Sequence, residues 1–143
     1  MNGFANKLKE LMDDKQIGAK VLAEKLGLSD SSVIYRWLKG SLGLLLPTAV
    51  GIADFFDCSL DYLFGRSEIY NGNFKECPAF DIQFRKVLKE QNISQNKLTK
   101  DKVISRGGLN SWLNKKQIPH IESIIKLADY LRVSMDYLVG REN

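Results

Sequence analysis

At 143 residues, the chain is long enough for one ordinary domain or for two small ones. No run of 18 or more apolar residues occurs, and the first residues lack the features of a signal peptide, so we expect a cytoplasmic protein without a membrane span. The formal charge is +4: residues 1–66 hold 8 Lys and Arg against 8 Asp and Glu, and residues 79–143 hold 12 against 7. This basic second half favours a polyanionic partner over a merely solubilising surface.

Five helices are predicted in the first half, because apolar residues recur at helical spacing between Gly, Ser and Pro at the expected ends. They cover residues 4–15, 19–26, 30–39, 47–56 and 60–64. We expect Gly27 to close the second helix in the left-handed conformation, Ser29 or Asp30 to cap the third, and Ser59 to cap the fifth. Residues 67–78, which contain Asn71-Gly72-Asn73 and Pro78, are predicted to be a linker.

The second half repeats this plan without any β pattern of useful length. Its first four predicted helices cover residues 80–91, 95–102, 106–114 and 119–131, and a short fifth helix follows Ser134. Ser94, Ser105 and Ser134 are expected to cap the second, third and fifth of them, and Pro119 to open the fourth. The chain is therefore predicted to be all-α, with domains at residues 1–66 and 79–143.

An internal repeat supports this division. Ser-Leu-Asp-Tyr-Leu-Phe-Gly-Arg at residues 59–66 returns as Ser-Met-Asp-Tyr-Leu-Val-Gly-Arg at residues 134–141, with six of eight residues identical 75 positions later. Trp37 and Trp112 are related by the same spacing, and both are expected in the core. Leu22 and Leu98 are 76 positions apart, so one copy has an extra residue, which we place at the start of the third helix of the first copy. The repeated aspartates, Asp61 and Asp136, are attributed to capping geometry in the fifth helix.

Two short helices joined by a tight turn, the second carrying Trp-Leu before a break, form a helix-turn-helix. The words Leu-Ala-Glu-Lys-Leu-Gly at residues 22–27 and Arg-Trp-Leu-Lys-Gly at 36–40, with Ile-Ser-Arg-Gly at 104–107 and Ser-Trp-Leu-Asn at 111–114, resemble the Cro and lambda-repressor (Xre) family. The resemblance covers all but the linker and the first few residues. It implies two tandem five-helix DNA-binding domains that recognise double-stranded DNA through helices 30–39 and 105–114.

A helix of ten residues is about 15 Å long and fits the major groove when its N-terminal residues are short or polar. The third helix of each copy meets this condition. The candidate base contacts are Ser31, Ser32, Tyr35, Arg36, Arg106, Gly107, Asn110 and Ser111. By the resemblance, residues opening the second helix and following the third hold phosphate, namely Lys20, Lys39, Ser94, Gln95, Lys97, Asn114, Lys115 and Lys116. Arg106 can pair with guanine and Asn110 with adenine.

Each copy departs from the family pattern. The first has Gly18-Ala19 where the family has polar residues, and Asp30 would repel phosphate. In the second, Val103 replaces the turn glycine and Lys102 replaces a usual apolar residue. Charge and spacing make the second copy the better predicted DNA reader.

No catalytic residues stand out, because the chain has no evident carboxylate pair, nucleophile with a histidine, or phosphate-binding glycine loop. Cys58 and Cys77 lack the spacing of a metal site or of a disulfide framework, so both are expected to be reduced thiols. His120 is expected to be a solvated residue beside Pro119. We therefore expect no enzyme activity, no cofactor and no metal.

The first hypothesis is a sequence-specific transcriptional regulator, a repressor, that binds the major groove of double-stranded DNA. The tandem would act as an intramolecular pseudo-dimer across two half-sites, or the chain would form a homodimer. The alternative is a protein-interaction module or antitoxin-like partner, in which the first copy mediates association and only the second binds DNA. The apolar run Leu42–Leu46 would then be an exposed surface, although it fits equally well as a loop folded onto its own core.

Overall fold

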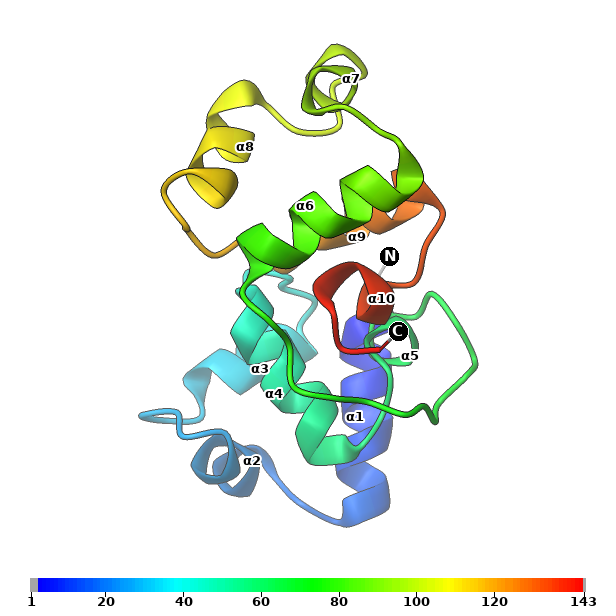
Figure 1. Cartoon of the computed structure of the whole chain (residues 1–143). Helices are drawn as coiled ribbons and strands as arrows, with labels where there is room; N and C mark the ends of the chain where they lie inside the picture. Colours follow the sequence, from blue (N-terminus) through cyan, green and yellow to red (C-terminus); the bar gives the residue numbers. More distant parts are fainter. Residues whose placement is uncertain (1–2, 143) are drawn as a thin grey trace. The chain divides into compact units, whose positions relative to one another are not determined.

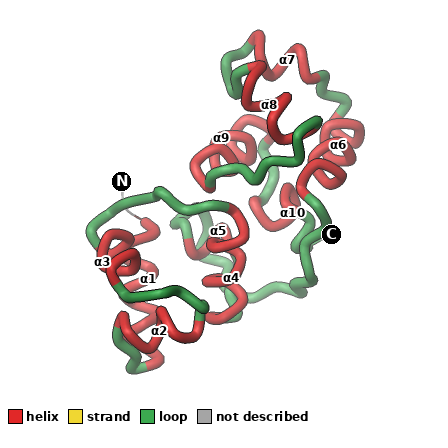
Figure 2. Tube along the Cα trace, turned by 90° about the vertical axis from the view of Figure 1, so that its left-hand side faces the viewer, coloured by secondary structure: helices red, strands yellow, loops and turns green. Residues whose placement is uncertain are grey.

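The chain divides into two compact units, Met1–Gly72 and Asn73–Asn143, and the computed structural model describes residues 3–142. Within the described residues there are ten α-helices and no β-strand, five helices in each unit (Figures 1 and 2). This confirms the predicted all-α fold. The predicted domain ends at Met1 and Asn143 lie outside the described residues.

Unit 1 is built around the first helix. Its helices are α1 (Gly3–Lys15), α2 (Ala19–Lys25), α3 (Ser32–Leu38), α4 (Leu46–Phe56) and α5 (Leu60–Leu63). α1 packs against α3 and α5, α2 packs against α3, and α4 packs against α5. Trp37 is only 2% exposed, and its ring lies 6.2 Å from that of Phe4, which stacks on Phe64 at 4.7 Å. Trp37 is therefore a core residue, as predicted.

Unit 2 repeats the packing of the first helix on the third and fifth, and of the fourth on the fifth. Its helices are α6 (Phe80–Gln91), α7 (Gln95–Lys100), α8 (Arg106–Leu113), α9 (Ile121–Leu131) and α10 (Met135–Val139). α6 packs against α8 and α10, and α10 packs against α9. Trp112 is 7% exposed and lies edge-on to Phe80 and Phe84, with ring centroids 5.9 and 6.1 Å away. Each tryptophan therefore packs the third helix of its unit against an aromatic residue of the first helix.

Four serines cap the helices that the sequence assigned to them. The Oγ atoms of Ser59, Ser94, Ser105 and Ser134 each accept a hydrogen bond from the backbone N–H three residues later, at 2.9–3.0 Å. These bonds satisfy N–H groups that have no partner within the helix.

The start of α3 differs from the prediction. The helix begins at Ser32 rather than near residue 30, and its N-cap is Ser31 rather than Ser29 or Asp30. Instead, the Asp30 carboxylate accepts a 2.8 Å hydrogen bond from the Ser32 N–H and a second bond from the Ser32 hydroxyl. Asp30 thus holds the chain in a turn just before the helix. In unit 2, α9 begins at Ile121 with His120 as its N-cap, so Pro119 precedes the helix rather than opening it.

The extra residue of the first copy lies in the second helix, which corrects the predicted position. α2 has seven residues and α7 has six. Gly27 and Lys102 both adopt the left-handed conformation, with φ of 73° and 58°, and each stands ten residues before its tryptophan. Lys102 is therefore the turn residue of unit 2, and Val103 is the counterpart of Leu28. From the turn onward the two copies share one register.

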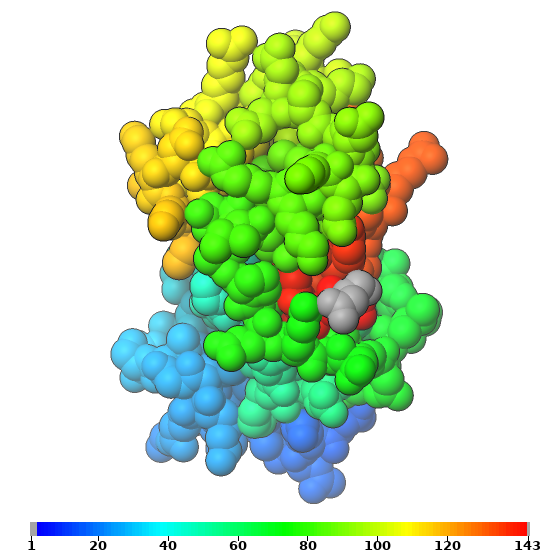
Figure 3. Space-filling model, viewed as in Figure 1, coloured from blue at the N-terminus to red at the C-terminus, as the bar shows by residue number. Residues whose placement is uncertain are grey.

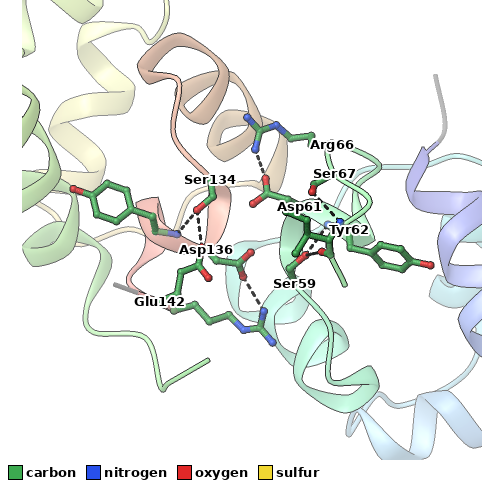
Figure 4. A network of polar contacts seen from close by, with 11 residues as sticks. Ser59, Asp61, Tyr62, Arg66, Ser67, Ser134, Asp136 and Glu142 are labelled. Atoms are coloured by element: carbon green, nitrogen blue, oxygen red, sulfur yellow. Dashed lines mark hydrogen bonds and ion pairs between the residues drawn. The ribbon is translucent and has the colours of Figure 1, made fainter. Parts of the chain in front are cut away.

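The repeated aspartates, which were attributed to capping geometry, each pair with an arginine, while Ser59 and Ser134 cap the helices. Asp136 accepts a 2.8 Å hydrogen bond from the Arg141 guanidinium, and both residues are 1% exposed (Figure 4). Asp61 and Arg66 form the equivalent ion pair in unit 1, where the Arg66 side chain is 21% exposed. The sequence signal was the conserved five-residue separation of Asp and Arg within the repeated word.

The segment predicted as a linker contributes to both units. In unit 1, the Ser59 N–H donates to the Tyr70 carbonyl at 2.9 Å, and the Tyr70 hydroxyl donates to the Phe56 carbonyl at 2.8 Å. In unit 2, the Arg141 guanidinium lies 4.0 Å over the Phe74 ring. The division between the units falls after Gly72, inside the predicted linker.

The run Leu42–Leu46 is not a continuous exposed strip. Leu44 and Leu46 are buried in the core of unit 1, Leu42 is half-buried, and Leu45 is 39% exposed. The alternating burial leaves no continuous apolar strip at the surface. An association surface built from all of these leucines is therefore excluded.

Candidate DNA-binding surface

The α7–turn–α8 segment of unit 2 is held from behind by apolar side chains. Leu98 on α7, Ile104 before α8, and Leu109 and Trp112 on α8 are all buried. Ser94 and Ser105 cap the two helices. The polar faces of both helices are consequently left at the surface, where this segment is coloured yellow-green to yellow (Figure 3).

A shallow groove of about 240 Å³ runs between α7 and α8. It is lined by Gln95, Asn96, Thr99, Arg106, Leu109, Asn110 and Asn114. Four of these residues are among the predicted base and phosphate contacts, so the fold brings together residues that are up to 19 positions apart in the chain. Asn96 and Thr99 were not predicted. Thr99 lies four residues after Gln95 and three after Asn96, and this helical spacing is the signal that would have found Thr99.

Asn110 and Asn114 are linked at the end of the groove. The Asn114 side-chain amide donates a 2.7 Å hydrogen bond to Asn110 Oδ1. Arg85 on α6 donates to the Leu113 carbonyl at 3.1 Å and thereby supports the end of α8. Since a carbonyl oxygen has two lone pairs, Asn110 can still accept a second hydrogen bond from a ligand. Sequence reasoning missed Arg85, because its role depends on the packing of α6 against α8.

Lys97 belongs to a polar network beside this groove. Its Nζ lies 3.1 Å from Asp101 Oδ2, which also accepts a 2.5 Å hydrogen bond from the Tyr130 hydroxyl on α9. The hydrogen bond from Tyr130, and to a lesser extent the one from Lys97, lower the pKa of Asp101, and donating to Asp101 raises the pKa of Lys97. Both groups are therefore charged near neutral pH, and part of the positive field of Lys97 is offset by Asp101.

The other predicted residues of unit 2 differ in accessibility. Arg106, Gly107, Lys115 and Lys116 are exposed, whereas Ser111 is half-buried. A Cβ added at Gly107 would meet nothing closer than Ser105 Oγ at 4.0 Å, so packing does not require glycine there. The missing side chain instead leaves the first turn of α8 open to close approach.

In unit 1, the predicted residues lie on the corresponding helices. Lys20 is on α2, and Ser32, Tyr35, Arg36 and Lys39 are exposed on or directly after α3. Ser31 is half-buried at the N-cap. Hydrogen bonds from the Ser32 hydroxyl and N–H, with a smaller effect of Arg36, lower the pKa of Asp30, so this carboxylate is charged.

Residues 3–142 contain no helix that is long and apolar enough to cross a membrane. The same residues contain no group of three or more His, Cys, Asp or Glu side chains that could hold a metal ion.

Comparison with known families gives one match in each half of the chain. Residues 7–68 match the model of the Cro/C1-type helix-turn-helix DNA-binding domain, and residues 84–138 match a helix-turn-helix family model. No curated protein and no solved structure matches the chain.

Proposed function

The chain belongs to the Cro/C1 (Xre) type helix-turn-helix family, with two tandem copies of the DNA-binding domain, and on this premise we propose that it is a sequence-specific transcriptional repressor. Unit 2 is the main reader of the operator. α8 enters the major groove, and residues at the start of α7 and after α8 hold the phosphates on either side.

The observation that carries this proposal is the groove between α7 and α8. It collects two residue types suited to base readout, Arg106 and Asn110, beside Gln95 and Asn114 at its phosphate-facing ends. α8 is an eight-residue helix, and the diameter of an α-helix with its side chains, about 10–12 Å, suits a major groove about 12 Å wide. Bound there, unit 2 would exclude other proteins from the same stretch of DNA.

The roles of the side chains follow from their chemistry. The Arg106 guanidinium can donate two hydrogen bonds to O6 and N7 of guanine, and the Asn110 amide can pair with N6 and N7 of adenine. Lys115 and Lys116 are exposed beyond α8, and there they would neutralise phosphates without distinguishing bases. Gly107 would permit close approach of the first turn to the base edges.

Two single variants separate base readout from phosphate binding. Arg106→Ala is expected to weaken binding to the selected operator by about 1–3 kcal/mol and to relax selectivity at one base pair. Lys115→Ala is expected to weaken specific and random duplexes alike and to reduce the slope of log K against log salt by about 1. Fluorescence anisotropy with the operator and with a scrambled duplex at several salt concentrations measures both effects.

Equal losses for Arg106→Ala on operator and scrambled DNA would contradict base readout by α8. Absence of any salt-dependent binding to duplex DNA would contradict the whole proposal and favour a protein-interaction module. In a reporter assay, the protein should lower expression only when the operator is present. An equal fall in expression after deletion of the operator would contradict repression.

A further inference from the structure

We infer that unit 1 also reads DNA and that Tyr35 on α3 recognises the 5-methyl group of thymine in a half-site distinct from that of unit 2. This inference rests on the proposed function and adds a second half-site and its base chemistry. The chain would then act as an intramolecular pseudo-dimer on a non-palindromic operator.

The shared register after the turn is the first argument. Because Gly27 and Lys102 occupy the same left-handed turn, ten residues before Trp37 and Trp112, Tyr35 stands at the position that Asn110 holds in unit 2. Asn110 lines the groove between α7 and α8 together with Arg106. The supposed shift at the start of α3, which would have displaced the reading face of unit 1, does not exist.

The exposure of Tyr35 is the second argument. Its side chain is 55% exposed on α3, although Ile34 and Trp37 on either side are buried. The two residues at the first turn, Ser31 and Ser32, have short side chains, so neither would keep the Tyr35 ring from a base edge. An aromatic ring at a reading position contacts the thymine methyl, the apolar group of the major groove.

Local charge is the third argument, and it differs from the charge of the whole unit. The helix-turn-helix segment of unit 1, residues 18–40, holds 4 Lys and Arg against 2 Asp and Glu, a net charge of +2. The matching segment of unit 2, residues 94–115, holds 5 against 1, a net charge of +4. The reading segment of unit 1 is therefore basic, even though residues 1–66 as a whole carry equal numbers of both signs.

Asp30 weakens this surface without removing it. Its carboxylate is occupied by the N–H and hydroxyl of Ser32, directly before α3. Lys20 and Lys39 are exposed on α2 and after α3, at the two positions where the family resemblance places phosphate contacts. We expect unit 1 to contribute less affinity than unit 2 while adding selectivity for thymine.

Replacing thymine by deoxyuridine tests the inference, because it removes the methyl group and keeps every hydrogen-bonding atom. The operator is first selected from random duplexes with the full chain, and the half-site insensitive to Arg106→Ala is assigned to unit 1. Deoxyuridine is then introduced into each half-site separately, and affinities are measured for the native chain, Tyr35→Ala and Tyr35→Phe. Circular dichroism checks that the two Tyr35 variants fold.

One lost methyl contact should weaken binding about fourfold, the effect of one buried CH₂ group. The native chain and Tyr35→Phe should show this loss in the unit 1 half-site, whereas Tyr35→Ala should bind thymine and deoxyuridine equally. Equal affinity of the native chain for both bases would overturn the inference, as would a loss that persists in Tyr35→Ala. A footprint covering one half-site per chain would overturn it while leaving the proposed function intact, and no DNA binding at all would overturn both.

Discussion

The buried Asp136–Arg141 pair allows a prediction with an internal control. Arg141→Ala removes a guanidinium that is 1% exposed, leaves the equally buried Asp136 carboxylate without this partner, and deletes the stacking contact on Phe74. Breaking a buried ion pair in this way destabilises a protein by about 3–5 kcal/mol, because the remaining charge is desolvated. We expect a loss of this size in unit 2.

Arg66→Ala is the matched control in unit 1. It breaks the same pair with Asp61, but the Arg66 side chain is 21% exposed, so water can replace part of the lost interaction. We expect a loss of about 1–2 kcal/mol there. The difference between the two variants reports the effect of burial together with the loss of the Phe74 contact, because the sequence separation and the Asp–Arg pairing are the same in both units.

Hydrogen exchange followed by mass spectrometry measures the free energy of opening of each unit within the full chain. Arg141→Ala should reduce protection in unit 2 alone, and Arg66→Ala in unit 1 alone. The double replacement Asp136→Leu with Arg141→Met should recover part of the loss, because no unpaired charge remains. Equal losses for the two single variants, or no recovery in the double variant, would refute the reasoning.

Three further outcomes are expected. Gly140→Ala should destabilise unit 2 by at least about 2 kcal/mol, because φ is 83° and the new Cβ would lie 2.5 Å from Pro78 Cδ. Gly27→Ala, where φ is 73° and the new Cβ would meet nothing within 4 Å, should destabilise unit 1 by only about 1 kcal/mol. Chemical denaturation measures both losses. The pKa of Asp101 is lowered in the folded state, first by Tyr130 and then by Lys97, so its contribution to stability is present above about pH 4 and is lost as the pH falls further. The free energy of unfolding of unit 2 should therefore fall less steeply with decreasing pH in Asp101→Asn. The same pH dependence as in the native chain would contradict this contribution of Asp101 to stability. Asp30→Asn keeps a capping side chain and removes a charge, so it should raise DNA affinity up to about fivefold at low salt; no change would indicate that unit 1 lies away from DNA.

Much of the fold could be predicted from local patterns. Ser59, Ser94, Ser105 and Ser134 were identified as caps because a capping side chain bonds a backbone N–H only three residues away. Trp37 was assigned to the core from its spacing to Ile34 on one helix face, and it is buried. Such features depend on neighbours within one or two helical turns, so a single sequence carries them.

The helix register was harder, because two placements of one extra residue satisfy the same apolar pattern. Lys102 was read as a misplaced polar residue, whereas it adopts a left-handed turn with φ of 58°. Lysine is an uncommon choice for this conformation, and only the backbone reveals that it takes the place of Gly27. The consequence for function is direct, since it aligns Tyr35 with Asn110.

The candidate site was predicted in part. Gln95, Arg106, Asn110 and Asn114 were named from the sequence and do line one groove, but their roles in DNA binding stay a proposal. The contacts of Arg85 with Leu113 and of Asp101 with Tyr130 went unrecognised, because the bonded residues are 28 and 29 positions apart in the chain.

By itself, the sequence determined the duplication, the helical class, the four capping serines and the basic character of the second copy, all of which follow from local spacing and composition. The tertiary structure alone decided that the extra residue lies in α2, that Arg141 is buried on Asp136, and that Leu44 and Leu46 are buried. These features depend on which surfaces meet after folding. Burial, unlike helical periodicity, is a property of contacts between distant segments and has no local signature in the chain.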